Sequence, residues 1–268
     1  MSSRFALIIE SSNVSGEKDL PGARADAKNW KSFLMSNLGG AWNEDEIIVR
    51  EKPEAEWVRR IIRNHADGYV FLVFSGHGQM VLDRTTWTYK SCVCLNNKER
   101  DVGIDSIMPQ HKGTAVFDCC RGMPQSGAFA KCGRVLNESF ALDGLSNESV
   151  ALNAMKSYIR ARCRHGFERG IDSLDSFRAV KMFACSEGEG AGEDPSAGGF
   201  YTSLLIGRAR DWECADQKRG GILIPGVNVL YTYDAHEMAC IGVMAKTKGR
   251  QVPKYSPIGQ AYPFAIRV

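Results

Sequence analysis

The stretch Tyr69-Val70-Phe71-Leu72-Val73-Phe74-Ser75-Gly76-His77-Gly78 is the most informative segment of the sequence. Its first six residues are apolar on both faces, which is typical of a central parallel strand covered by helices on both sides. A second stretch has the same plan, because the apolar run 114–117 leads directly into Asp118-Cys119-Cys120-Arg121-Gly122. Ligands of an open parallel sheet bind beyond the carboxyl ends of its strands. If the two strands are neighbours, His77 and Cys120 therefore meet at one edge of the sheet.

The rest of the chain alternates short apolar runs with amphipathic stretches. This pattern predicts an α/β fold with a mostly parallel central sheet and helices on both faces. Further strands are expected at 5–10, 47–49 and 180–185, and an accessory hairpin is expected at 86–95. Helices are expected at 23–37, from 53, at 150–163, at 201–212 and over much of 227–245, with closing strands at 252–255 and 264–268. No internal repeat is visible, so residues 1–268 are interpreted as a single domain.

Composition and charge exclude several classes of protein. The 268 residues are 44% hydrophobic and 24% charged, which is ordinary for a globular protein and argues against disordered, collagen-like and fibrous chains. The net charge of +3 is too small to indicate a nucleic-acid partner. The apolar run 5–9 is too short for an export signal or a membrane span, and nine scattered cysteines indicate reduced thiols. We therefore expect a cytoplasmic protein that has no membrane partner.

A cysteine and a histidine at neighbouring strand ends predict nucleophilic catalysis. A free thiol has a pKa of roughly 8.5, and an adjacent imidazole can raise its ionised fraction or take its proton during attack. The glycines beside His77 free backbone N–H groups that could face a developing oxyanion. A zinc site is the chemical alternative, but the nine cysteines include no Cys-x-x-Cys pair. A thiol enzyme that does not cleave peptides also remains open.

Together, the two motifs resemble the caspase and metacaspase superfamily of cysteine peptidases. Asp118-Cys119-Cys120 matches the Asp-x-Cys pattern of metacaspases, so Cys120 corresponds to the nucleophile and His77, 43 residues upstream, to its general base. The resemblance continues through 6–9, 20–27, 183–187 and 199–202, and so covers about residues 4–212. It implies a caspase-like fold with a large-subunit-like part at about 1–125, a linker at about 126–178 and a small-subunit-like part at about 179–268.

The same resemblance implies how the site would bind protein or peptide substrates. The backbone N–H groups of Gly78 and Cys120 would form the oxyanion hole. Asp26 and Asp118 would line an acidic S1 pocket, which favours Arg or Lys at P1 through charge-assisted hydrogen bonds. Classical caspases instead use arginines to cleave after Asp, and Arg24 and Arg121 keep that alternative open.

Activation is the last feature that the resemblance addresses. Processing by the enzyme itself or by an upstream protease could occur in the linker, where the candidate points are Arg160, Arg162, Arg164 and Arg169. The alternative is that these arginines cover a helix face or bind an acidic partner. No cofactor is expected apart from calcium, which activates some metacaspases; the acidic residues that could bind it are Glu187, Glu189, Glu193 and Asp194, although they form no EF-hand. The resemblance suggests a role in cell death or defence, with a catalytically silent scaffold as the rival class.

Overall fold

The computed structural model describes residues 3–123, 150–174, 178–215 and 226–268. Much of the expected linker, residues 126–149 and 175–177, therefore lies outside the described residues. Within the described ranges, none of the helices is long and apolar enough to cross a membrane.

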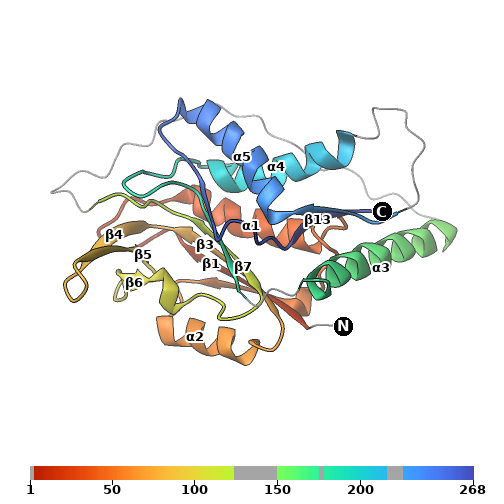
Figure 1. The fold of residues 1–268 in the computed structure, drawn as a ribbon, viewed down its shortest axis with the longest axis horizontal. Coiled ribbons are helices and arrows are strands. Elements are labelled where there is room, and N and C mark those ends of the chain that lie inside the picture. The colour runs from red at the N-terminus through yellow and green to blue at the C-terminus, as the bar shows by residue number, and fades with distance from the viewer. Residues whose placement is uncertain (1–2, 124–149, 175–177, 216–225) are drawn as a thin grey trace.

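A six-stranded sheet in the order β12-β8-β7-β3-β1-β2 forms the centre of the fold (Figure 1). The parallel strands are β1 (Arg4–Ser11), β2 (Ile47–Glu51), β3 (Tyr69–Gly76), β7 (Gly113–Asp118) and β8 (Val180–Phe183). The edge strand β12 (Lys254–Ser256) runs antiparallel to β8. Every residue of β1, β3 and β7 is buried, as the apolar runs predict for central strands.

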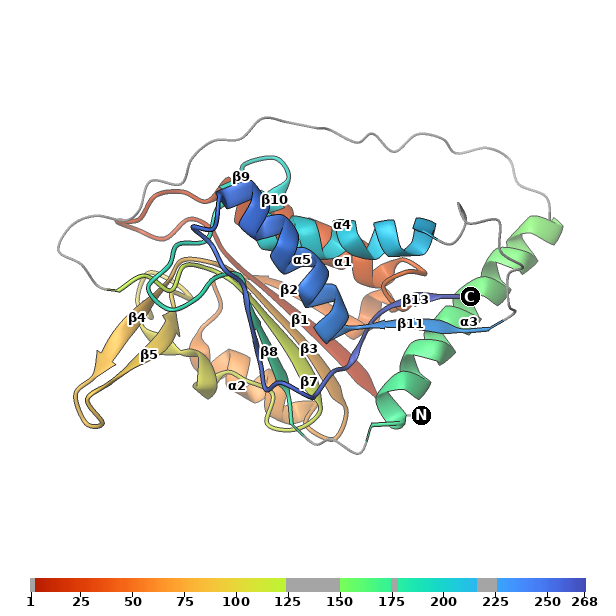
Figure 2. The same ribbon diagram turned by 45° about the horizontal axis from the view of Figure 1, so that its top comes forward.

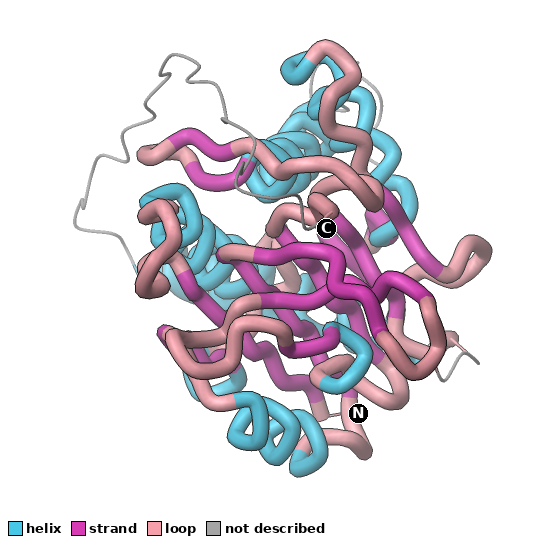
Figure 3. The backbone as a smooth tube through the Cα atoms, turned by 90° about the vertical axis from the view of Figure 1, so that its left-hand side faces the viewer, coloured by secondary structure: helices cyan, strands magenta, loops and turns pink. Residues whose placement is uncertain are grey.

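Helices cover both faces of this sheet, as Figure 3 shows from the left-hand side of Figure 1. One face packs against α1 (Pro21–Met35), α3 (Val150–Asp172), α4 (Phe200–Ala215) and α5 (Thr232–Thr247). The other face packs against α2 (Ala55–Asn64) and the short 3-10 helix η2 (Ile104–Ser106). Alternate residues of β3 enter the two cores, with Phe71 and Val73 on the first face and Leu72 and Phe74 on the second. The prediction of an α/β architecture with a mostly parallel central sheet and helices on both faces is confirmed.

Three smaller sheets surround the central one. The antiparallel strands β4 (Gly78–Asp83), β5 (Thr88–Val93) and β6 (Val102–Gly103) begin directly after His77 (Figure 2). The accessory hairpin expected at 86–95 begins earlier than predicted, because its first strand is β4 and residues 86–95 contain only its second strand, β5. Two short antiparallel ladders join β9 (Glu193–Asp194) to β10 (Gly198–Gly199), and β11 (Asn228–Tyr231) to β13 (Pro263–Arg267). The closing strand expected at 264–268 is therefore present as β13, although it pairs with β11 and not with the central sheet. A further 3-10 helix, η1 (Glu44–Glu46), precedes β2.

Candidate active site

The register of β3 and β7 brings the two sequence motifs together. These strands are parallel neighbours, and their last paired residues are Ser75 and Asp118. His77 and Cys120 each lie two residues beyond that pair, at the same carboxyl edge of the sheet. The two strands are therefore adjacent, which is the condition that the sequence analysis set for the two residues to meet.

Gly78 packs directly against the backbone that carries the cysteine. A Cβ atom at this position would lie 2.7 Å from the carbonyl oxygen of Cys120 and 2.7 Å from the Sγ of Cys119. A side chain at position 78 would thus push the two loops apart. Glycine is required here because the backbones approach too closely for a Cβ atom.

The imidazole of His77 is oriented by a backbone carbonyl. Its Nε2 donates a hydrogen bond to the carbonyl oxygen of Lys18 at 2.7 Å. A carbonyl can only accept, so Nε2 carries the proton and the neutral ring has its lone pair on Nδ1. Burial lowers the pKa of His77 below its usual value of 6.5, which favours this neutral, basic form at pH 7. Lys18 was not expected from the sequence, because a backbone carbonyl carries no residue-type signal.

The two adjacent cysteines differ in their surroundings. Cys119 is 5% exposed, and burial raises the pKa of its thiol well above the usual value, which is typical of an inert structural thiol. Cys120 is half-buried, and its Sγ accepts the backbone N–H of Ala191 at 3.3 Å. Cys120 is therefore the better candidate nucleophile of the pair.

Asp26 and Asp118 both lie beside the short strand β10. Asp26 is 1% exposed; its Oδ2 accepts the hydroxyl of Ser75 at 2.6 Å and its Oδ1 accepts the N–H of Gly199 at 2.9 Å. Asp118 is 6% exposed, and its Oδ2 accepts the N–H of Thr202 at 3.0 Å. A Cβ atom at Gly199 would overlap the carboxylate of Asp118. The structure thus brings the two predicted S1 carboxylates together and covers them with β10.

Glu193 is a third carboxylate in this cluster. The β9–β10 ladder pairs Glu193 with Gly199, the residue that bonds to Asp26 and packs on Asp118. Burial, followed by the nearby charge of Asp118, raises the pKa of Glu193 to about 7. Burial also raises the pKa of Asp26 and of Asp118, and the charge of Asp118 raises that of Asp26 further. The sequence analysis placed Glu193 only among the candidate calcium ligands, because a two-residue strand leaves no periodic signal.

The two arginines that could select an acidic P1 residue are both paired within the chain. Arg24 donates to both carboxylate oxygens of Asp19, at 2.9 and 2.6 Å. Arg121 is 7% exposed, with its guanidinium 2.8 Å from Glu187 and 4.2 Å from the ring centroid of Phe183. Among the described hydrogen bonds and ion pairs, neither guanidinium contacts the carboxylates of Asp26 and Asp118.

The carboxylates that were candidate calcium ligands bind separate partners within the chain. Glu187 pairs with Arg121, and the Oε2 of Glu189 accepts the N–H groups of Ser186 and Val252. Asp194 accepts two backbone N–H groups and the hydroxyl of Ser196 through one oxygen, Oδ1. Across the parts of the chain that the structure describes, no three His, Cys, Asp or Glu side chains are grouped to hold a metal ion. The suggested calcium ligands thus do not converge on one point.

The four arginines that were candidate processing points all lie on α3, at the opposite end of the molecule from the β4–β5 hairpin (Figure 2). Arg160 donates to the carbonyl oxygens of Met35 and Trp42, at 2.8 and 2.7 Å. Arg162 lies over the ring of Tyr158, and Arg169 is exposed.

Arg164 belongs to a network of ion pairs that fastens α3 to the body of the protein. It makes two 2.7 Å hydrogen bonds to Glu46 and lies 3.0 Å from Glu168. The buried guanidinium of Arg4 also reaches both of these carboxylates. The structure thus favours the alternative in which arginines of this segment cover a helix face.

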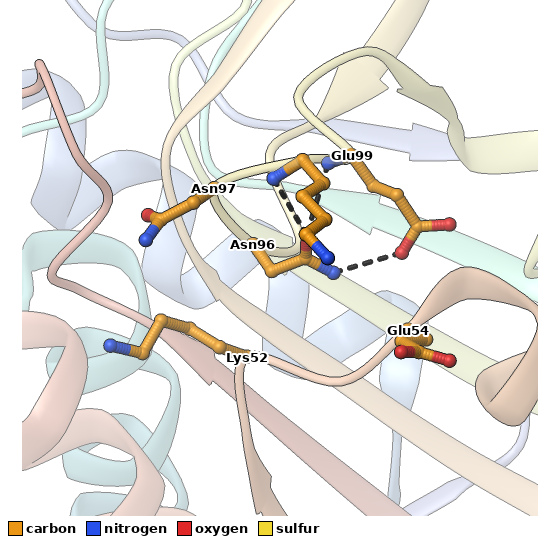
Figure 4. A pocket seen from close by; sticks show the side chains of 6 residues that line it. Lys52, Glu54, Asn96, Asn97 and Glu99 are labelled. Atoms are coloured by element: carbon orange, nitrogen blue, oxygen red, sulfur yellow. Dashed lines mark hydrogen bonds between the residues drawn. The ribbon is translucent and has the colours of Figure 1, made fainter.

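Two hollows lie near the same edge of the sheet. One, of about 530 Å³, opens just beyond the end of β2, and its lining contains amides, lysines and glutamates in a mixed set (Figure 4). There Glu99 accepts the N–H of Ala55 and the side-chain amide of Asn96, both at 2.8 Å, so these groups bind each other. The second hollow, of about 20 Å³, lies beside the histidine and is lined by Glu17, His77, Gly78, Gln79, Cys94 and Arg100.

Comparison with known proteins agrees with this architecture. The family model described as the caspase domain matches residues 3–257. A search of curated protein sequences found no match. Among solved structures, caspase-1 from Spodoptera frugiperda is similar, with a TM-score of 0.56 and 12% sequence identity over 97% of this chain and 89% of the other. At this identity the likeness concerns the fold.

Proposed function

Because this chain belongs to the caspase-domain family of cysteine peptidases, we propose that it is an endopeptidase in which Cys120 is the nucleophile and His77 the general base. The observation that carries the proposal is the β3–β7 register, which places both residues two positions beyond paired strand ends. The tautomer fixed by Lys18 supports the assignment, since it makes Nδ1 the basic nitrogen of the ring.

The reaction that follows from these roles is acyl transfer. His77 takes the proton of the Cys120 thiol as the sulfur attacks the scissile carbonyl carbon, and the N–H groups of Gly78 and Cys120 stabilise the oxyanion. His77 then returns the proton to the leaving amine, and water hydrolyses the acyl-enzyme. The close packing of Gly78 on the Cys120 backbone supports a shared oxyanion hole.

We propose further that the enzyme cleaves after Arg or Lys. Asp26, Asp118 and Glu193 gather three carboxyl groups beside β10, and a guanidinium or ammonium group would pair with them in a site largely withdrawn from water. Its positive charge would lower the pKa values that burial raises and so favour the ionised carboxylates. The rival specificity, cleavage after Asp, has less support because Arg24 and Arg121 are already paired with Asp19 and Glu187.

The proposal includes an activation step. Ala191 bonds to the sulfur of Cys120, and β10 covers the two aspartates, so the segment 191–199 has to shift before a P1 side chain can reach them. Proteolytic processing by the enzyme itself or by an upstream protease is the trigger that we propose. A cut at an arginine of α3 would also require that helix to unwind, because proteases prefer exposed loops. The family relationship alone underlies our proposal of a cytoplasmic role in cell death or defence.

Covalent labelling tests the catalytic assignment. A peptidyl ketone that alkylates active-site thiols and carries Arg at P1 is incubated with the protein, and the modified residue is identified by mass spectrometry. We expect modification of Cys120, none in Cys120→Ala, and unchanged labelling in Cys119→Ala, the matched control. Labelling of Cys119, or equal labelling of several cysteines, would overturn the assignment.

A further inference from the structure

The backbone of Ala191 covers the sulfur of Cys120. Its N–H donates to Sγ at 3.3 Å, and its carbonyl oxygen lies 3.8 Å from the same sulfur. The next residue, Gly192, is buried and leads into β9, and its carbonyl accepts the N–H of Phe200 at the start of α4. Gly192 therefore joins the residue that covers the sulfur to the β9–β10 ladder beside the S1 carboxylates.

The side chain of Gln251 holds Gly192 in place. Its Oε1 accepts the N–H of Gly192 at 2.9 Å, and its Nε2 donates to the carbonyl oxygen of Ala184, also at 2.9 Å. An N–H can only donate and a carbonyl can only accept, so these two partners fix the orientation of the amide. Gln251 is 2% exposed, and its own N–H donates to Oγ1 of Thr247 on α5 at 3.2 Å. The amide thus ties Gly192 to the residue that follows β8 and to α5.

The neighbouring residue, Val252, makes a second attachment to the same loop. Its N–H donates to Oε2 of Glu189 at 2.7 Å, and its carbonyl oxygen accepts the hydroxyl of Ser186 at 2.9 Å. The same Glu189 oxygen accepts the N–H of Ser186 at 3.1 Å, which closes the loop on itself. The short connection between α5 and β12 therefore holds the loop 186–192 at both of its ends.

We propose that this connection is an autoinhibitory latch, in which the amide of Gln251 holds Ala191 against the sulfur of Cys120 until the protein is activated. The inference rests on the proposed function, which makes Cys120 the nucleophile and requires the segment 191–199 to shift. It adds the contacts that hold that segment in place before activation. Loss of one neutral hydrogen bond shifts an equilibrium by roughly 2- to 10-fold, so loss of both bonds of the Gln251 amide should favour the open arrangement measurably.

Gln251→Met tests the latch, because methionine keeps the length of the side chain and removes both of its hydrogen bonds. The rate at which iodoacetamide alkylates Cys120 in unprocessed protein is measured by mass spectrometry. We expect this rate to rise about tenfold over that of the wild type, since the sulfur is uncovered more often. Gln110→Met is the matched control, because it removes an exposed amide that donates to the carbonyl oxygen of Met108, and it should leave the rate unchanged.

Two other cysteines distinguish an opened latch from a loosened fold. Cys119 is buried beside Cys120 and should stay unlabelled in every variant, and the exposed Cys214 reports the intrinsic rate of alkylation in each sample. Glu189→Ala breaks the second attachment and provides the same test if Gln251→Met does not fold. An unchanged rate at Cys120, or labelling of Cys119 that rises together with it, would overturn the inference.

Peptide cleavage separates this inference from the proposed function. Unprocessed Gln251→Met should cleave a P1-Arg peptide faster than unprocessed wild type, and the difference should shrink after limited proteolysis, because the latch acts only before activation. If processed wild type cleaves the peptide but the unprocessed variant shows no gain, the inference is wrong while the proposed function holds. If no form cleaves the peptide, the proposed function fails, and the alkylation of Cys120 still decides whether Gln251 holds the loop closed.

Discussion

The carbonyl oxygen of Lys18 accepts the Nε2 proton of His77 at 2.7 Å, from a loop that is 59 residues distant in sequence. This bond turns the ring so that Nδ1 is the basic nitrogen. In the proposed mechanism, the backbone carbonyl would take the place of the carboxylate that orients the histidine in a Ser-His-Asp triad. Substitution of Lys18 would leave the carbonyl in place, so the contact depends on the path of the loop 12–20. The Leu20 N–H bond to the carbonyl of Ser12 and the Arg24–Asp19 ion pair help to fix that path.

The pH dependence of kcat should report His77. Burial lowers the pKa of His77 below 6.5, and the neutral ring is the form that accepts a proton. Activity should therefore persist as pH falls through 6.5 and decline only at lower pH. The measurement is kcat at saturating substrate from pH 4.5 to 8, compared with the unfolding profile over the same range. A decline centred at or above pH 6.5 in folded protein would contradict the role assigned to the buried, neutral ring.

Removal of a single S1 charge should weaken substrate binding more than turnover. Asp26→Asn and Asp118→Asn each take away one charge-assisted partner of a P1 guanidinium, worth about 1.5–3 kcal/mol or roughly 10- to 100-fold in KM. Glu44→Gln is the matched control, because it removes one negative charge at an exposed ion pair with Lys31. Steady-state kinetics with a P1-Arg peptide should show the rise in KM only for the two aspartate variants. If Glu44→Gln raised KM by the same factor, the rise would reflect the net charge of the protein and not a contact of the two aspartates with the P1 side chain.

Gly199 in β10 should tolerate no side chain, whereas Gly207 on the following helix α4 should accept one. A Cβ atom at Gly199 overlaps Asp118, so Gly199→Ala should destabilise the fold by about 1–3 kcal/mol and impair binding of P1-Arg peptides. A Cβ atom at Gly207 meets nothing within 4 Å, and Gly207→Ala should stabilise α4 by about 0.5–1 kcal/mol. Chemical denaturation of both variants makes the comparison. Equal stability of the two would show that β10 does not pack on Asp118 as described.

The attachment of α3 should control its cleavage. Arg164→Gln leaves the buried Glu168 without one of its cationic partners and should destabilise the contact of α3 with the body by about 1–3 kcal/mol. Trypsin should then cut at Arg162 and Arg169 faster than in wild-type protein, as followed by mass spectrometry of the fragments. Arg169→Gln, a change at an exposed residue, serves as the control for charge, with the rate of the cut at Arg162 as the quantity compared. If the wild type and Arg164→Gln were cut in α3 at the same rate, the ion pairs would not be what protects this helix.

The positions of His77 and Cys120 were predictable because each reactive residue type directly follows an apolar run that marks a central strand. The apolar runs 69–74 and 114–117 mark central strands, and His77 and Cys120 follow them at equal offsets in the β3–β7 register. The resemblance to metacaspases added Asp26, which has no local signal of its own and proves to be buried against Ser75. For His77 and Cys120, local pattern and tertiary structure agree.

Other parts of the site depend on contacts that leave no mark in the sequence. The roles of Lys18 and Ala191 come from backbone atoms, and Glu193 joins the aspartates through a ladder of two-residue strands. For the arginines of α3, the sequence pattern was misleading. A basic cluster suggests exposed processing points, but Arg160 and Arg164 form contacts with residues more than 100 positions away in the sequence.

The central claim, a Cys120 peptidase with an acidic S1 pocket, is tested most directly with three peptides that differ only at P1. Wild-type and Cys120→Ala protein are incubated with the Arg, Lys and Asp versions, before and after limited proteolysis to allow for activation, and the products are identified by mass spectrometry. We expect wild-type protein to cleave after Arg and Lys, and the variant to cleave none of the three. Cleavage after Asp alone would contradict the S1 assignment of Asp26 and Asp118, and cleavage that persists in Cys120→Ala would contradict the nucleophile.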